Sequence, residues 1–215
     1  MKESIVALVG AIVLAVPSPV AAQTAKKEPS AVNAKITDGT TTVDVSDLKL
    51  RYIISTRRDP VTSHSPSWDL ATLYISISGR TGSSFWNDQL AFELTELKRL
   101  EYEGEYDENG SRREHGPRLQ IEKRDGSIRI LVAEPTGVTG PGYFEERNSS
   151  GETLKRFPIS HWEYGGKIGG DTAEGSSMSF FVGRVQTPLG TPGDFSLNDL
   201  AMRRIDFYTE VAPSR

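Results

Sequence analysis

The segment "ISHWEYGG" places four side chains suited to chemistry or binding in a row, His161, Trp162, Glu163 and Tyr164. If the segment is a strand, the spacing of His161 and Glu163 brings both side chains to one face, as an acid–base pair or two metal ligands require. One histidine with scattered carboxylates does not form a metal motif, because a metal site needs several ligands at fixed spacing. We therefore expect no metal ion and no cofactor, and keep a hydrolase that uses His161 and Glu163 as an alternative.

The three tryptophans, Trp68, Trp86 and Trp162, all lie among polar, loop-like residues. Gathered at one end of the fold, their rings would form an aromatic platform, a surface that holds sugar rings or peptide side chains. The competing interpretation is that each indole closes the end of a strand and packs against the core. Packing is favoured for Trp68 and Trp86, whereas the two interpretations balance for Trp162. The predicted ligand-binding residues are His161, Trp162, Glu163, Tyr164, Trp68 and Trp86.

Motifs for nucleophilic catalysis and phosphate binding are absent from the sequence. No serine lies in a Gly-x-Ser-x-Gly turn, and "GGKIGG" lacks both the spacing and the Ser or Thr of a phosphate-binding loop. The chain contains no cysteine, which excludes thiol catalysis and thiolate metal ligands. We therefore assign no catalytic residue and expect a protein that binds its ligand without converting it.

The charge pattern argues against nucleic acid as a partner. The formal net charge is −4, and paired cations such as Arg57-Arg58 and Arg112-Arg113 stand between carboxylates. A nucleic-acid site needs Lys and Arg clustered on one face. The expected partners are a carbohydrate, a peptide or an envelope protein.

The N-terminal sequence predicts export. Lys2 precedes an apolar run from Ile5 to Val16, and small residues at Val20 and Ala22 fit the cleavage positions of a signal peptide over residues 1–22. The apolar run is short for a membrane span, so a retained anchor is the minor alternative. A secreted or periplasmic protein without a membrane span after cleavage is expected. The polar stretch that follows predicts a flexible leader over residues 23–38.

The rest of the chain has the pattern of a β-protein. Apolar residues recur at every second position in several segments, as in a strand with one face on a core and one in water, and loops rich in Gly and Pro separate these segments. We predict one all-β domain over residues 39–215, an antiparallel β-sandwich or a jelly-roll-like fold. The apolar positions that carry this prediction are Leu48, Leu50, Tyr52 and Ile54, then Leu73, Ile75 and Ile77, then Ile205, Phe207, Thr209 and Val211.

The dipeptide Asp125-Gly126 predicts a two-residue hairpin turn of type I′, in which both residues have positive φ. Pairing outward from this turn sets Lys123 opposite Ile128, Ile121 opposite Ile130 and Leu119 opposite Val132. All the aliphatic side chains then lie on one face.

Residues 90–103 fit two patterns. Leu90, Phe92 and Leu94 alternate as in a strand, whereas the leucines from Leu90 to Leu100 also match one face of a helix. Two strands followed by a turn at Asp107–Gly110 are favoured, because the neighbouring segments are strands. One short helix remains the alternative.

These observations predict an exported, non-catalytic binding domain that recognises a carbohydrate, a peptide or a protein partner through aromatic loops. A structural or assembly protein of the cell envelope without a ligand pocket is the second alternative, beside the hydrolase. Such a protein would use exposed strand edges and would bury its tryptophans.

Overall fold

The computed structural model describes residues 31–39, 41–56, 67–107, 109–136, 142–164, 175–198 and 203–208. Most of these residues lie in antiparallel strands, and the helical structure among them is one short 3₁₀ turn. The elements are β1 (Asn33–Asp38), β2 (Thr41–Thr56), β3 (Ser67–Leu70), β4 (Thr72–Thr81), β5 (Ser84–Glu93), η1 (Leu94–Glu96), β6 (Leu97–Glu103), β7 (Arg118–Lys123), β8 (Ile128–Val132), β9 (Gly142–Arg147), β10 (Thr153–Ile159), β11 (His161–Tyr164), β12 (Gly175–Gln186), β13 (Pro192–Asn198) and β14 (Arg204–Tyr208).

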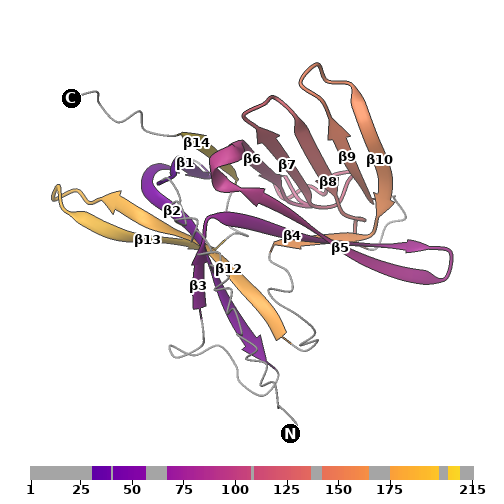
Figure 1. The fold of residues 1–215 in the computed structure, drawn as a ribbon, viewed down its shortest axis with the longest axis horizontal. Helices are drawn as coiled ribbons and strands as arrows, with labels where there is room; N and C mark the ends of the chain where they lie inside the picture. Colours follow the sequence, from indigo (N-terminus) through magenta and orange to yellow (C-terminus); the bar gives the residue numbers. More distant parts are fainter. Residues whose placement is uncertain are drawn as a thin grey trace, which may run out of the picture.

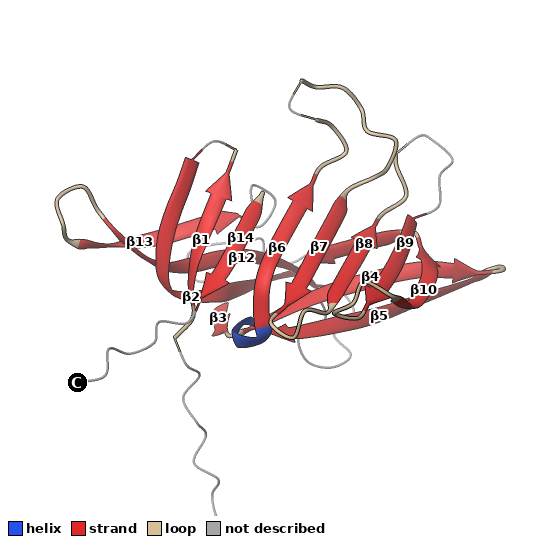
Figure 2. Ribbon diagram, turned by 90° about the horizontal axis from the view of Figure 1, so that it is seen from above, coloured by secondary structure: helices blue, strands red, loops and turns tan. Residues whose placement is uncertain are grey.

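The strands form two sheets of unequal size. The large, 11-stranded sheet has the order β10-β9-β8-β7-β6-β14-β1-β2-β12-β13, with β3 paired to β2, and the small, 3-stranded sheet has the order β11-β4-β5. Strands β4 and β5 run across strands β6–β10 in both views of the ribbon (Figures 1 and 2). This packing of antiparallel sheets confirms the predicted all-β sandwich.

The core lies where the small sheet covers the large one. Leu73, Ile75 and Ile77 of β4 are at most 2 % exposed and alternate with half-buried residues, as the sequence pattern predicts. The matching pattern of β2 is also confirmed, since Leu48 and Leu50 are buried. Apolar side chains of β6–β9 complete this interior from the large sheet, among them Leu100, Leu119, Ile121, Leu131 and Phe144.

Two connections fix the small sheet on the large one. The buried hydroxyl of Tyr52 on β2 donates a hydrogen bond to the carbonyl of Thr72 at 3.2 Å and accepts one from the N–H of Tyr74 at 3.0 Å. At Ser160 the chain leaves β10 in the large sheet and enters β11 in the small sheet. The Ser160 N–H donates to the carbonyl of Ser78 on β4 at 2.8 Å. The two layers are therefore held by hydrogen bonds as well as by apolar contact.

The ordered domain begins earlier than the predicted flexible leader allows. Residues Asn33–Asp38 form β1, between β14 and β2 in the large sheet, and Ala34 and Ile36 are buried there. The prediction failed because the pattern is short, and of its three buried residues one is the polar Asn33 and one is the small Ala34. The predicted signal peptide lies outside the described residues.

The register predicted for the β7–β8 hairpin is wrong by one residue. Ile121 pairs with Arg129 and Leu119 with Leu131, so Ile130 and Val132 lie on the opposite face from Ile121. The Lys123 N–H donates to the carbonyl of Ser127 and the Gly126 N–H to that of Lys123, which makes a three-residue loop. Of the two predicted turn residues only Gly126 has a positive φ, of 84°, and it sits at the bulge of this longer loop.

Residues 90–103 form strands, as the favoured interpretation predicts. Strand β5 ends at Glu93, the 3₁₀ turn η1 follows, and β6 begins at Leu97. The predicted turn at Asp107–Gly110 is present, because the Gly110 N–H donates to the carbonyl of Asp107 at 3.1 Å.

Candidate binding site between the two sheets

Trp162 lies in the core of the sandwich. Its ring is 6 % exposed, its Nε1 donates a hydrogen bond to the carbonyl of Pro117 at 3.0 Å, and it packs edge-to-face on Tyr102. An indole with a satisfied N–H and a buried ring is a packing residue. Trp162 therefore cannot offer an open ring face to a ligand, and the structure supports the packing interpretation at this position.

His161 and Glu163 share one face of β11, as the sequence predicts. This is the exposed face, since their side chains are 64 % and 65 % accessible and His161 Nε2 lies 3.9 Å from Glu163 Oε2. Interaction with the Glu163 carboxylate raises the pKa of His161, and the same interaction lowers the pKa of Glu163. The lowered pKa does not suit the Glu163 carboxyl to act as a general acid, which requires a raised carboxyl pKa.

Trp86 is also a packing residue and not part of an open platform. Trp86 is half-buried on β5, with its ring 5.8 Å from that of Phe157 and so close to Gly79 that an added Cβ would lie 2.4 Å from its Cζ2. Trp68 on β3 and Tyr164 on β11 have side chains outside the described part of the structure. The ring of Trp86 therefore packs between Gly79 of β4 and Phe157 of β10.

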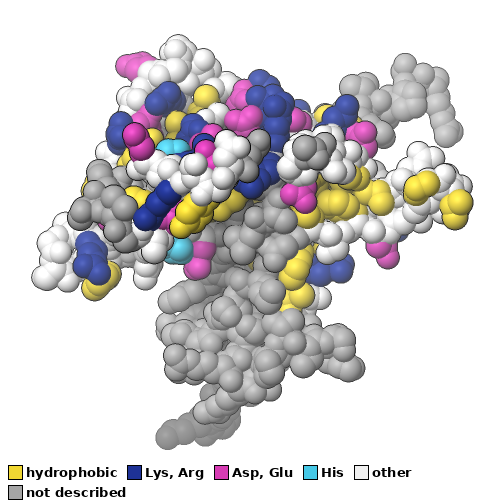
Figure 3. Space-filling view, turned by 180° about the vertical axis from the view of Figure 1, so that it is seen from behind, with side chains coloured by type: hydrophobic (Ala, Val, Ile, Leu, Met, Phe, Trp, Pro, Cys, Tyr) yellow, Lys and Arg dark blue, Asp and Glu magenta, His cyan; other side chains and the backbone are white. Residues whose placement is uncertain are grey.

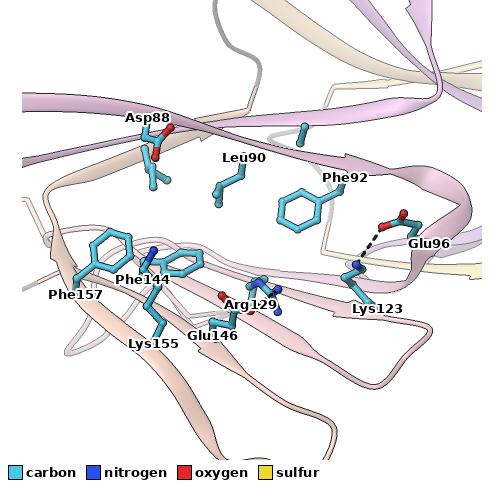
Figure 4. A pocket seen from close by; sticks show the side chains of 12 residues that line it. Asp88, Leu90, Phe92, Glu96, Lys123, Arg129, Phe144, Glu146, Lys155 and Phe157 are labelled. Atoms are coloured by element: carbon cyan, nitrogen blue, oxygen red, sulfur yellow. Dashed lines mark ion pairs between the residues drawn. The ribbon is translucent and has the colours of Figure 1, made fainter.

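A cavity of about 290 Å³ lies between β5 and strands β7–β10. Figure 4 shows side chains of β5 on one wall, including Asp88, Leu90 and Phe92, and side chains of the large sheet on the other. The volume is at the lower end of the range of small-molecule pockets. The cavity was not predicted from the sequence.

The large-sheet wall includes parts of two neighbouring rows on one face of that sheet. Leu119, Leu131, Phe144 and Phe157 pair in succession across β7–β10 and form an apolar row. The next row along these strands begins at Ile121 and continues with Arg129, Glu146 and Lys155. The inner face of the large sheet thus changes from apolar to charged where the small sheet ends at β5.

Most charges in the cavity neutralise one another. Arg129 Nη2 lies 2.6 Å from Glu146 Oε1, and Lys123 Nζ lies 3.1 Å from Glu96 Oε2. Lys155 and Asp88 differ, because neither has an ion-pair partner among the described residues. The Lys155 ammonium lies 5.1 Å from the centre of the Phe157 ring, and Asp88 Oδ1 accepts a hydrogen bond from the N–H of Gln89.

The outer face of the large sheet has a different organisation. Lys98 pairs with Glu122 at 2.6 Å, and Arg99 and Arg204 both donate to Asp206. Partial burial works to raise the pKa of Asp206, but the two arginines outweigh it and hold the pKa below its usual range. Seen from behind, acidic and basic side chains lie intermixed over the upper half of the molecule (Figure 3). On this part of the outer face the opposite charges therefore neutralise one another.

Two other kinds of feature are absent from the described ranges. Those residues contain no group of three or more His, Cys, Asp and Glu side chains placed to hold a metal ion. They also contain no helix long and apolar enough to cross a membrane.

Comparisons with protein-family models, with curated protein sequences and with solved structures each found no match.

Proposed function

We propose that this protein is a non-catalytic binding domain that holds a peptide segment of a protein partner in the cavity between β5 and β7–β10. The observation that carries the proposal is the position of Lys155 and Asp88 on opposite walls of one cavity, each charged and each without an ion-pair partner in the described chain. A ligand that brings both a carboxylate and a cation would neutralise both groups.

A peptide fits these walls better than a sugar. Sugar sites present an open aromatic face beside neutral hydrogen-bonding groups. Here Phe144 is 3 % exposed, so its ring is not an open platform, and the available polar groups carry full charges of both signs. Peptide side chains supply matching charges together with apolar groups for Leu90 and Phe157. The signal-peptide pattern at the N-terminus supports a role outside the cytoplasm.

The test is selection from a displayed decapeptide library, followed by affinity measurement on Lys155→Ala. We expect enriched peptides to bind this variant about tenfold more weakly, because a charge-assisted contact is lost. Lys35→Ala is the matched control, since Lys35 is also an exposed strand lysine but lies on β1. Equal affinity of both variants, or enrichment of no peptide, would refute the proposal. A glycan array in parallel would reveal a sugar ligand, which would also refute it.

A further inference from the structure

The free edge of β5 borders the cavity and differs from the other sheet edges. β5 has ten residues and pairs without a register shift with β4, its only partner among the described strands. It contains no proline, lysine or arginine, the residues that commonly protect an exposed edge. Each other edge has such a protection or is short. β10 contains Pro158 and a bulge, β13 begins with Pro192, and β3 and β11 have four residues each.

The register identifies which backbone groups of β5 point away from β4. Thr81 and Ser84 flank a two-residue turn and must exchange the first pair of hydrogen bonds. The N–H and C=O groups directed to the free edge therefore belong to every second residue, Phe85, Asn87, Gln89, Ala91 and Glu93. The hydrogen bond from the Gln89 N–H to the Asp88 side chain agrees with this assignment, because that N–H is not used by β4.

From this geometry we infer that a partner segment adds as an extended strand to the free edge of β5. The inference rests on the proposed function and specifies how the peptide is held. Because β5 runs across β7–β10, an added strand would run along the charged row of Arg129, Glu146 and Lys155 (Figures 1 and 4). Main-chain hydrogen bonds would supply affinity, and side chains on one face would enter the cavity and supply specificity.

The charges define the partner chemistry. Every second side chain of an added strand points toward the large sheet. One of these positions faces Lys155 and takes an acidic residue, and a position beside Asp88 takes a basic one. The position over Arg129 and Glu146 takes an uncharged residue, because these two side chains already neutralise each other at 2.6 Å. The occupant is thus an extended segment with one acidic and one basic residue on its inward face, and with no proline where its N–H meets β5.

The experiment uses the full chain and synthetic versions of the decapeptides enriched in the library. Each peptide is made with a single N-methyl group at successive backbone positions, and its affinity is measured. Strand addition predicts an alternating result: about a tenfold loss where the amide faces β5, and about twofold or less at the positions between. Ala91→Pro, which removes an outward N–H, should weaken the same peptides about tenfold. Ala91→Ser is the control.

The outcomes separate this inference from the proposed function. Peptides that depend on Lys155 but respond to N-methylation without alternation would overturn strand addition and leave the binding function standing. A second copy of the chain is the rival occupant of the edge. If the wild-type protein sediments as a dimer that Ala91→Pro dissociates, and no peptide is enriched, both the strand addition of a partner and the proposed function are overturned.

Discussion

Strands β5 and β10 are both sheet edges and contact each other through Trp86 and Phe157, yet their exposed edges are built differently. β10 carries Pro158, a bulge and two cations, Lys155 and Arg156, all of which discourage pairing with another strand. β5 is long and regular, and its one charge on the inner face is Asp88. The difference teaches that protection is applied edge by edge: of these two edges, which both line the cavity, only β5 lacks a proline, a cation and a bulge.

The largest effect is expected where the two edges meet. Trp86→Ala should lower the free energy of unfolding by about 2–3 kcal/mol, because the half-buried ring packs on both Phe157 and Gly79. A double-mutant cycle with Phe157→Ala, measured by urea denaturation, should give a coupling of about 1 kcal/mol.

Phe85→Ala is the control for Trp86→Ala. Phe85 precedes Trp86 on β5 and is 73 % exposed, so its removal should change stability by less than about 0.5 kcal/mol. If both variants lose the same stability, Trp86 does not join the two edges.

Removing the proline of β10 should make the edges more alike. Pro158→Thr restores an N–H on the outer side of β10, and we expect more oligomer in sedimentation velocity than for the wild-type protein, with a change in stability of about 1 kcal/mol or less. Unchanged sedimentation would show that the bulge and the two cations protect the edge without the proline.

Asp88→Asn should relax the choice of partner at β5. A partly exposed charge contributes about 1 kcal/mol or less, so enriched peptides with a basic residue should bind about two- to fivefold more weakly. Glu93→Gln is the control, because Glu93 lies on the same strand but faces away from the cavity and accepts a hydrogen bond from Thr72. A loss of equal size in both variants would mean that Asp88 does not contact the peptide.

The smallest effect is expected at β11, the opposite edge of the small sheet. Glu163→Gln should return the raised pKa of His161 toward its ordinary value, which an NMR titration of the ring would show. Because the pKa of His161 is higher in the folded state than in the unfolded state, the interaction stabilises the protein at pH values below the ordinary histidine pKa. This stabilisation is lost as the pH rises through the pKa of the folded state. The stability difference at acidic pH should stay below about 0.5 kcal/mol because both groups are largely exposed. A change in peptide affinity would contradict the assignment of the site to β5.

The fold was predictable wherever large aliphatic residues alternate, as at Leu73, Ile75 and Ile77. The hairpin register was not, because Asp-Gly occurs in both two-residue and three-residue loops. Four hairpin loops in the described part of the chain share the longer form. In each, a Gly with positive φ donates its N–H to the carbonyl three residues before it: Gly110 to Asp107, Gly126 to Lys123, Gly151 to Asn148 and Gly190 to Thr187. A polar residue three positions before a glycine was the available signal.

The cavity was harder to predict than the strands. Lys155 and Asp88 lie far apart in the sequence, and only the crossing of the two sheets brings them to opposite walls of one cavity. The row that contains Lys155 also depends on the exact pairing of β8, β9 and β10. The polar neighbours of Trp162 favoured a binding role for its ring. Those neighbours, His161 and Glu163, lie on the exposed face of β11, whereas the indole lies in the interior.

The placement of β14 has a consequence for the order of folding. This strand, Arg204–Tyr208, is the only link between β1 and β6 in the described large sheet. A ribosome must therefore have synthesised almost all of the chain before the N-terminal hairpin can join strands β6–β10 within the large sheet. Pairing over such long sequence separations slows folding. The nascent protein should remain open to chaperones until translation is nearly finished.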